Sequence, residues 1–311
     1  MYSFIEIFKK KGGLGLVRQW WNSKVLSLAF IEFLLLGKNQ KGLELLREVL
    51  NYKQKVKLKK KYSRFLQNMP KHDSLEHHAN KKIWIMWWQG IDKAPIVVRR
   101  CYRSVKESFP DWDITLLTEN NWKEYIYLPN YIISKFHEGN IPMAQFSDML
   151  RLQLLIEKGG LWIDSTVFVN SQFSLPHPIV AYEDTELFLY QREVGKCSNW
   201  LILAKTNNEV LIEVRDCLFE YWKRNNKLTD YFIFHRFFEI VSERHAESVG
   251  KIPFYSNSLP HILLLHLFDK YDEDFWKDLN SQTSIHKLSY KLDTAKMKMS
   301  GTYYDKLIGS E

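Results

Sequence analysis

The chain has 311 residues, of which 45% are hydrophobic and 26% are charged, and its formal net charge is +8. At roughly 150 residues per domain, this length predicts one large or two small domains with a substantial core. The composition excludes a disordered chain, a collagen and a coiled coil. The aromatic content of 15%, with 11 tryptophans, is high and indicates a binding cleft or a membrane boundary.

The cysteines and the lengths of the apolar segments indicate a reducing compartment and no membrane-spanning helix. Cys101, Cys197 and Cys217 form no CxxC pair, so we expect free thiols that act as small core residues in a reducing compartment. The N-terminus lacks the order of a signal peptide. The longest apolar run near it covers residues 25–36, whereas a membrane-spanning helix needs about 20 residues. We therefore expect a cytoplasmic chain without a membrane-spanning helix.

The positive charge lies in the first quarter of the chain. Residues 1–80 contain 16 Lys/Arg and 6 Asp/Glu, whereas residues 81–311 contain 28 and 30. The densest part is the lysine run at residues 53–61, which indicates a solvated helix face, an anionic lipid surface or nucleic acid. We do not expect nucleic acid, because zinc-finger, RNP-like and helix-turn-helix signals are missing. Apolar side chains near the basic residues favour peripheral contact with an anionic membrane surface: Phe4, Ile5, Ile7, Phe8, Trp20 and Trp21.

Hydrophobic spacing and turn residues predict the order of elements. In chain order they are helices over residues 24–36 and 41–52, a polar linker over 70–80, a buried strand over 83–88, a helix from 95 to about 107, a strand over 114–117 and a later helix over 231–244. A strand–helix–strand order is typical of a parallel α/β sheet. We therefore predict a basic helical region over residues 1–75 and an α/β domain over residues 80–311.

A second helix-to-strand segment carries chemically informative residues. Its helix is predicted to begin at Pro142 and to end at Gly159-Gly160. Asp148 and Arg151 lie three residues apart and so share one helix face.

The predicted strand that follows, over residues 161–169, contains a carboxylate among apolar residues. Asp164 and Thr166 are two apart, so we expect them on one face. A buried ionised Asp costs several kcal/mol unless it is paired or binds a cation. Asp164 therefore forms either a structural pair with an arginine or a ligand site at the carboxyl end of the strand.

Other polar residues have plainer interpretations. We expect exposed linker histidines at His72, His77 and His78, and core or partly buried histidines at His261 and His266. Turn or cap residues are expected at Asp111 and Asp113, and a helix start at residues 272–274. Asp230 and His235 are expected either on the acceptor side of a site or as a helix N-cap and a packed histidine.

Several blocks together resemble one family. They are SDMLR at 147–151, GGLWIDSTV at 159–167, KIWIMWWQG at 82–90, FPDWDITLL at 109–117, DYFIFH at 230–235 and IHKLSYK at 285–291. This combination resembles the capsular polysaccharide synthesis proteins of glycosyltransferase family 32, and is more distantly similar to the clostridial glucosylating toxins. The resemblance covers roughly residues 80–305.

The resemblance implies an α/β fold of the GT-A type: a Rossmann-like nucleotide-sugar-binding domain, here with a helical N-terminal extension. It also implies a nucleotide-sugar donor, a divalent cation (Mn²⁺ or Mg²⁺) and transfer with retention at the anomeric carbon. UDP is the nucleotide it suggests. The implied acceptor is an undecaprenyl-diphosphate-linked oligosaccharide of capsule or exopolysaccharide synthesis, handled at the inner face of the cell membrane.

The matched positions imply roles for individual residues. Trp88 would stack on the donor base, with Gln89 and Gly90 beside the nucleotide. Asp148 and Arg151 would hold the donor sugar and its phosphate. The remaining matched residues would contact the donor, the metal or the diphosphate: Ser147, Lys287 and Ser289 for the donor, and Asp164, Thr166 and His286 for the metal.

The sequence departs from the family pattern at one position of the DxD motif. Thr166 stands where the second Asp is expected, so the motif reads Asp-Ser-Thr and a metal would lose one carboxylate ligand. Mg²⁺ keeps several waters and shares ligands with phosphate, so one carboxylate and a diphosphate could still hold it. A catalytically silent scaffold and a protein-modifying glycosyltransferase are the alternative functions that we retain.

Overall fold

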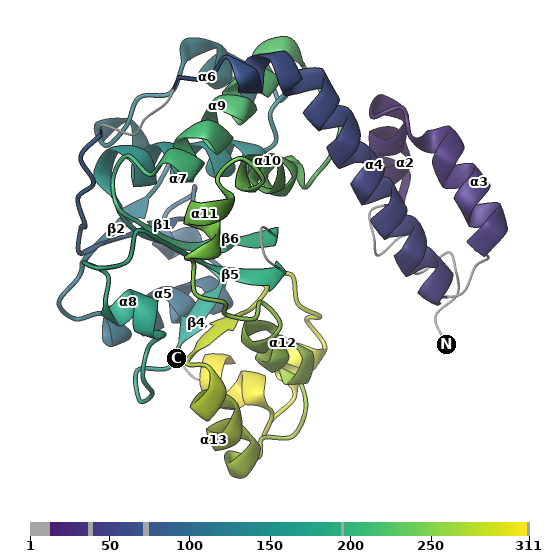
Figure 1. Cartoon of the computed structure of the whole chain (residues 1–311). Coiled ribbons are helices and arrows are strands. Elements are labelled where there is room, and N and C mark those ends of the chain that lie inside the picture. Colours follow the sequence, from purple (N-terminus) through teal and green to yellow (C-terminus); the bar gives the residue numbers. More distant parts are fainter. Residues whose placement is uncertain (1–12, 37–39, 71–74, 194–195, 310–311) are drawn as a thin grey trace. The chain divides into compact units, whose positions relative to one another are not determined.

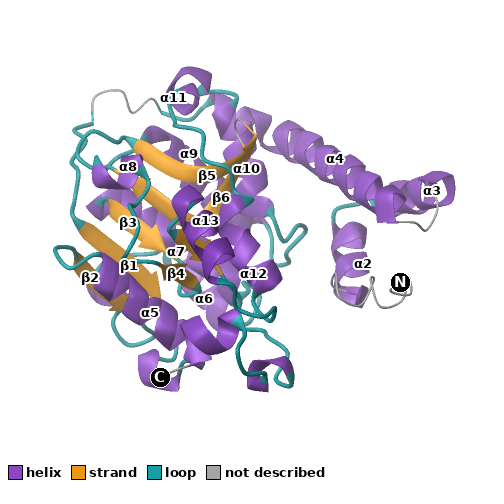
Figure 2. Ribbon diagram, turned by 90° about the horizontal axis from the view of Figure 1, so that it is seen from below, coloured by secondary structure: helices purple, strands orange, loops and turns teal. Residues whose placement is uncertain are grey.

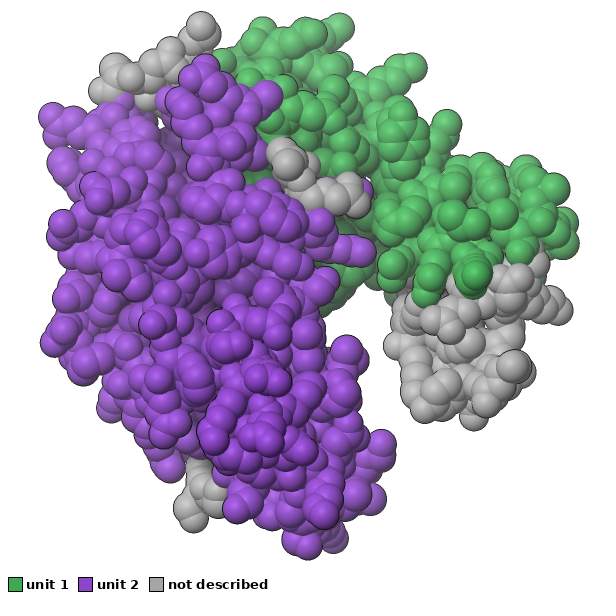
Figure 3. All heavy atoms as spheres, turned by 60° about the horizontal axis from the view of Figure 1, so that its bottom comes forward, with its two compact units in different colours: residues 1–72, 128–149, 213–244 green, residues 73–127, 150–212, 245–311 purple. Residues whose placement is uncertain are grey.

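We analysed a computed structural model of the chain, which describes residues 13–36, 40–70, 75–193 and 196–309 (Figure 1). The chain divides into two compact units, each made of three segments (Figure 3). Unit 1 comprises residues 1–72, 128–149 and 213–244, and unit 2 comprises residues 73–127, 150–212 and 245–311. Unit 1 therefore combines the N-terminal region with two later segments of the chain. Phe4, Ile5, Ile7, Phe8 and His72 lie outside the described residues.

Unit 1 is built from helices. It contains α2 (Gly13–Asn22), α3 (Leu26–Leu36), α4 (Gln40–Gln67), α6 (Asn130–His137) and α10 (Ile233–Ser242), together with the first part of α7 (Met143–Lys158) and most of α9 (Glu209–Arg224). The two predicted N-terminal helices are confirmed as α3 and α4. Within the described segments, none of the helices combines the length and the apolar character that crossing a bilayer requires.

The helix α4 is longer than the hydrophobic spacing predicted. It continues through the lysine run as far as Gln67. Its N-terminal half packs against α3, where Val25, Ala29, Leu46 and Leu50 form a small buried cluster. The helix therefore extends past its apolar residues. Side chains of its lysine-rich second half contact neighbouring elements of unit 1.

Unit 2 contains a five-stranded mixed sheet (Figure 2). Its strand order is β2 (Asp113–Leu117), β1 (Lys82–Met86), β3 (Gly160–Ile163), β6 (Lys196–Ala204) and β5 (Leu187–Glu193). β1 runs parallel to β2 and β3, whereas β6 runs antiparallel to β3 and β5. The helix α5 (Ile96–Ser108) connects β1 to β2, which confirms the predicted strand–helix–strand unit and the α/β class.

The predicted single strand over residues 161–169 is wrong. The chain turns at residues 164–166, where the Val167 amide donates to the Asp164 carbonyl oxygen at 3.0 Å. After this turn β4 (Val167–Val169) leaves the large sheet and pairs antiparallel with β7 (Ile285–Lys287) in a separate two-stranded sheet. Alternation cannot reveal such a turn, because the apolar residues on its two sides continue the same pattern.

Short elements complete the described chain. They are the α-helices α8 (His177–Val180), α11 (Ala246–Gly250), α12 (Ile262–His266) and α13 (Glu273–Gln282), the 3₁₀ turns η1 (Ile91–Lys93), η2 (Trp122–Glu124), η3 (Leu259–His261) and η4 (Lys296–Lys298), and the π-helical turn η5 (Asp305–Gly309). α12 and α13 supply buried side chains to the cluster beside β4 and β7.

A hydrophobic core lies against the strands of unit 2. Its buried side chains come from the strands and from α5, and include Ile83, Ile85, Val105, Phe109, Leu161, Ile163, Val167, Phe188, Leu201 and Leu203. All three cysteines are free and buried, which confirms their prediction as core residues. Burial raises the pKa of the Cys101 thiol to about 12, so it is a neutral thiol at physiological pH.

The predicted Gly159-Gly160 turn joins α7 to β3. Gly160 has a φ of +97°, and a Cβ at this position would overlap with the Lys82 carbonyl oxygen of β1. Beside it, the buried Trp84 indole donates to the Gly159 carbonyl oxygen at 3.0 Å. The turn therefore fixes where β3 begins, and with it the position of the residues that follow β3.

We predict that Gly160→Ala lowers the free energy of unfolding by about 3 kcal/mol, since it combines an unfavourable φ with a backbone clash. Gly139→Ala is the matched control, because Gly139 has a φ of +74° and open space where the Cβ would lie. It should cost only about 1 kcal/mol. Urea unfolding of both variants measures the difference, and equal losses would contradict the close approach to β1.

Candidate functional site

The candidate site lies at the carboxyl end of the parallel strands of unit 2. β1 and β3 pair in register, Ile83 with Leu161 and Trp84 with Trp162, so both strands end at the same edge of the sheet. Residues 87–90 follow β1 at this edge, and residues 164–166 follow β3. Open α/β sheets place their ligands at such an edge.

Asp164 is held by its own backbone at this edge. Its amide donates to the Trp200 carbonyl oxygen at 2.8 Å, and its carbonyl oxygen accepts from Val167. Its side chain keeps an exposure of 27%. The Trp162 indole donates to the Oδ1 atom of Asp164 at 3.0 Å. The carboxylate is therefore fixed in orientation and still reaches solvent.

Arg151 reaches the same carboxylate from α7. Its Nη1 atom lies 3.5 Å from Asp164 Oδ1 and also donates to the Asn199 carbonyl oxygen. The guanidinium carbon lies 4.8 Å from the centre of the Trp162 ring, where a cation is attracted by the ring face. With a side-chain exposure of only 6%, Arg151 is firmly positioned. The Asp–Arg pair considered from the sequence is present.

Lys287 approaches the carboxylate from the other side. Its Nζ atom donates to Thr166 Oγ1 at 2.6 Å and lies 3.7 Å from Asp164 Oδ2. The backbone brings these residues together, because Lys287 pairs with Val167 and the Leu288 amide donates to the Thr166 carbonyl oxygen at 2.8 Å. The structure thus brings four predicted site residues into one group, which we call the Asp164 cluster: Arg151, Asp164, Thr166 and Lys287.

Aromatic side chains lie at the ends of β1 and β7. Trp87 contacts Tyr290 edge to face, with ring centres 5.3 Å apart, and Tyr290 is 43% exposed. The predicted stacking residue Trp88 is half-buried, and its carbonyl oxygen accepts from Glu119. Gly90 turns the chain with a φ of +82°.

The remaining predicted donor residues fall on two elements. Gln89 is exposed in the turn after β1, and Ser289 Oγ accepts from the Lys291 amide at 3.1 Å. Asp148 and Ser147 lie on α7 and are 4% and 6% exposed. Asp148 precedes Arg151 by three residues, so the predicted shared helix face is present.

The structure does not bring His286 to the Asp164 cluster. In β7 it alternates with Lys287 and faces the other side, where it is fully buried beside the Trp276 ring, at 5.2 Å. Its Nε2 atom lies 3.1 Å from the Asn280 Oδ1 atom. Burial lowers the pKa of His286 to about 3, so its ring is neutral at physiological pH. The metal-ligand role expected for it is replaced by a packing role.

The Asp164 cluster does not fit a divalent cation. In the described part of the chain, no group of three or more His, Cys, Asp or Glu side chains is arranged to hold a metal. The Asp164 carboxylate faces Arg151 and Lys287, and the Thr166 hydroxyl accepts from the Lys287 ammonium. A metal on Asp164 and Thr166 would meet the ammonium, and like charges at such distances repel. The expected Mn²⁺ or Mg²⁺ site therefore lacks its ligands in this arrangement.

The sequence did not predict two contacts near this edge, one from Trp162 to Asp164 and one between Trp87 and Tyr290. Trp162 precedes Asp164 by two residues, so strand alternation could have placed both on one face. The contact between Trp87 and Tyr290 joins residues about 200 positions apart in the sequence. No spacing in the sequence encodes it.

The plainer interpretations are mostly borne out. His77 contacts Glu186 at 3.0 Å, and His266 contacts Asp269 at 2.8 Å. The Asp272 side chain caps α13 by accepting from the Phe275 amide. Asp230 is not the N-cap of α10, which is Phe232; it accepts from the Phe232 amide and pairs with Arg236 at 3.1 Å.

A second charged feature lies in unit 1, along the lysine run of α4. Lys55 contacts Glu239 at 2.8 Å and Glu243 at 2.7 Å, and Lys57 donates to two backbone carbonyl oxygens before α3. Burial alone would lower the pKa of Lys55, but these glutamate contacts raise it. Part of the basic run therefore holds α4 to its neighbours.

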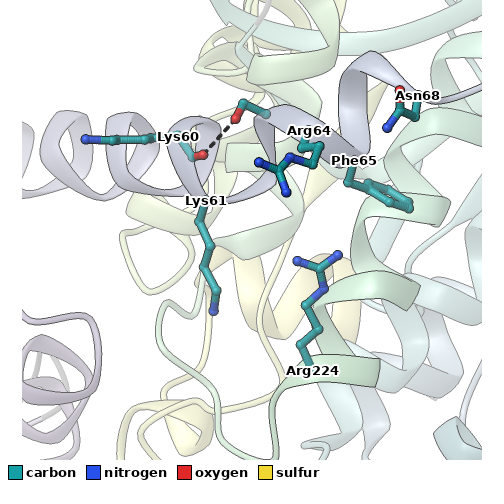
Figure 4. A pocket seen from close by; sticks show the side chains of 7 residues that line it. Lys60, Lys61, Arg64, Phe65, Asn68 and Arg224 are labelled. Carbon is teal, nitrogen blue, oxygen red and sulfur yellow. Dashed lines mark hydrogen bonds between the residues drawn. The ribbon is translucent and has the colours of Figure 1, made fainter.

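Beyond these contacts, α4 borders a basic hollow of about 550 Å³ (Figure 4). Seven side chains line it. Four are cationic, namely Lys60, Lys61, Arg64 and Arg224, and the other three are Ser63, Phe65 and Asn68. Burial lowers the pKa of Lys61, and the nearby Arg224 lowers it further.

We predict that His286 makes stability pH-dependent. Because its pKa is about 3 when folded and 6.5 when unfolded, the unfolded chain binds the extra proton between these values. This contribution to stability is complete above pH 6.5 and falls by about 1.4 kcal/mol per pH unit as the pH decreases toward 3.

Denaturant unfolding at pH 7.0, 6.0 and 5.0 measures this slope. His286→Gln keeps a donor for Asn280 and should flatten the slope relative to wild type. His137→Gln, at an exposed position at the end of α6, is the control and should leave the slope unchanged. Equal slopes for wild type and His286→Gln would show that His286 is not buried as described.

Comparisons with known proteins place the chain in a family. A 100-residue stretch is 28% identical to an O-glycosyltransferase, braB, of Annulohypoxylon truncatum, and covers 29% of this chain and 24% of that protein. The chain thus spans about a quarter of the length of this curated relative. A solved structure, a PaToxG glycosyltransferase, matches 84% of this chain and 97% of its own with 14% identity and a TM-score of 0.38. The family model described as capsular polysaccharide synthesis protein matches residues 38–307. The chain therefore belongs to the capsular polysaccharide synthesis protein family.

Proposed function

We propose that the chain is a glycosyltransferase that uses a nucleotide-sugar donor. The observation that carries this proposal is the pair of cationic side chains, Arg151 and Lys287, that meet at Asp164 at the carboxyl edge of the sheet. Family membership and the glycosyltransferase relative support it. A nucleoside diphosphate leaving group gains negative charge as the sugar departs, and fixed cations stabilise that charge.

The residues at the carboxyl edge of the sheet have different roles in binding the donor. Arg151 and Lys287 hold the diphosphate, and Asp164 keeps both cations oriented. The resemblance also assigns Asp148, three residues before Arg151 on α7, to the donor sugar. The aromatic side chains Trp87, Trp88 and Tyr290 provide ring faces for the nucleotide base, since bases stack well on aromatic rings.

The finer features of the proposal come from the resemblance. They are a GT-A arrangement of the sheet in a transferase domain over residues 80–311, a UDP-sugar donor, retention at the anomeric carbon and a lipid-linked oligosaccharide acceptor of capsule synthesis. We propose no step through a metal, because the cluster does not fit one. The residues described here do not select one donor sugar.

We predict that Arg151→Lys lowers the rate of nucleotide-sugar hydrolysis or transfer by at least about 100-fold, because lysine cannot reproduce the fixed fork of the guanidinium. Asp164→Asn, which keeps the acceptor for Trp162, should also lower the rate. Release of nucleoside diphosphate from a panel of nucleotide sugars measures both.

Arg103→Lys, at an exposed position of α5, is the control and should retain wild-type activity. Melting temperatures of the three variants separate unfolding from loss of chemistry. Wild-type rates in a folded Arg151→Lys variant would overturn the proposed site, and would favour a scaffold without catalysis.

We also propose that unit 1 contacts an anionic membrane surface, the inner face of the cell membrane. Support comes from the outward stripe of α3, where Phe30, Ile31, Leu34 and Leu35 are each more than half exposed. Helical spacing places the four on one side, opposite Ala29, which packs on α4. Such an exposed apolar patch is typical of a contact surface, and the excess of basic residues in the first 80 positions favours anionic lipid.

The double substitution Leu34→Gln/Leu35→Gln should weaken binding to vesicles of anionic phospholipid by at least about 10-fold, because each leucine loses apolar burial. Sedimentation with vesicles measures this binding. Leu265→Gln, at a position 78% exposed in unit 2, is the matched control. Equal binding by both variants and wild type would exclude α3 as the membrane contact.

A further inference from the structure

We infer that the Lys287 ammonium takes the place of a divalent cation at the donor diphosphate. This inference rests on the proposed function, since it assigns a role within the donor site. It concerns the departure at Thr166, where the family pattern expects a carboxylate. The structure fills the space between positions 164 and 166 with an ammonium group from the chain itself.

The Lys287 ammonium lies where a metal ion bound by residues 164 and 166 would lie. Its Nζ atom donates to the Thr166 hydroxyl at 2.6 Å and lies 3.7 Å from Asp164 Oδ2, so it contacts both positions of the DxD-like motif. An aspartate at position 166 would serve a divalent metal. A threonine hydroxyl suits an ammonium, because it accepts one hydrogen bond without adding a second negative charge.

The backbone on both sides of Lys287 keeps this cation in place. Lys287 is paired with Val167 across the two-stranded sheet, and the next residue, Leu288, donates to the Thr166 carbonyl oxygen. The Lys287 side chain is 18% exposed. A lysine anchored in this way is positioned before any ligand arrives, which increases the strength of its interaction with a phosphate.

Two fixed cations beside Asp164 favour a phosphate over a metal. Arg151 Nη1 and Lys287 Nζ lie 3.5 Å and 3.7 Å from the Asp164 carboxylate, so a diphosphate would find two cations there, whereas a divalent cation at Asp164 would be repelled by both. His286, which was also expected as a metal ligand, faces away from the Asp164 cluster and contacts Asn280 instead.

In the transfer step the bond between the anomeric carbon and the diphosphate oxygen breaks, and its electron pair stays on that oxygen. Lys287 and Arg151 stabilise the new charge. The acceptor hydroxyl oxygen forms the new bond to the anomeric carbon, and its proton passes to the leaving diphosphate. No oxidant, reductant or metal is needed for this balance.

The test is nucleoside diphosphate binding by calorimetry, with UDP, GDP, CDP and dTDP, in EDTA and then in Mn²⁺. Wild type should bind one of them equally well in both conditions. Lys287→Met should weaken that binding by about 10- to 100-fold, the loss expected for a charged hydrogen-bonding partner. Lys287→Arg should recover part of it. Lys277→Met, at an exposed position of α13, is the matched control and should bind like wild type.

The outcomes separate this inference from the proposed function. Binding by wild type that requires Mn²⁺, with a Mn²⁺ signal that depends on Asp164, would overturn the role of Lys287 and leave the donor site intact. Failure of every nucleoside diphosphate to bind in either condition would overturn the donor site, and this inference with it. The wild-type comparison needs no variant, so a poorly folding Lys287→Met cannot obscure the result.

Discussion

The negative charge of Asp164 is the constraint on which the arrangement of the site depends. A carboxylate at the end of a buried strand must be compensated, because an ionised group that loses water without a partner is strongly unfavourable. Arg151 from α7, the Trp162 indole and Lys287 from β7 each meet this requirement. The consecutive elements α7 and β3 are thereby joined at one edge of the sheet by β7, which lies more than 100 positions later in the sequence. Arg151 and Lys287 place two fixed cations at this edge, which suits a phosphate ligand.

The turn after β3 makes this convergence possible. A strand that continued straight from Ile163 would have carried Thr166 along the large sheet. Instead, the chain turns at Asp164 and β4 pairs with β7, so that Lys287 comes to lie beside Thr166. The close approach of Gly160 to β1 sets the start of the same strand. A glycine without a side chain and a turn of three residues thus determine where the charged groups meet.

The sequence predicted the elements better than it predicted their ends and partners. Hydrophobic spacing located α3, the unit of β1, α5 and β2, and the helix that carries Arg151, because these are local patterns. It also selected Asp164, Thr166 and Lys287 through the family resemblance. It missed the break between β3 and β4, and it missed that His286 is buried facing away from the Asp164 cluster. Both depend on pairing between residues more than 100 positions apart, which no local pattern contains.

The direct test of the account is an experimental structure of the protein with UDP and a non-hydrolysable UDP-sugar. We predict diphosphate oxygens about 2.7–2.9 Å from Lys287 Nζ and from the Arg151 guanidinium, as in charge-assisted hydrogen bonds. The base should lie against the aromatic side chains after β1. A diphosphate bound elsewhere, or a metal ion between Asp164 and the diphosphate with Lys287 displaced, would contradict the account.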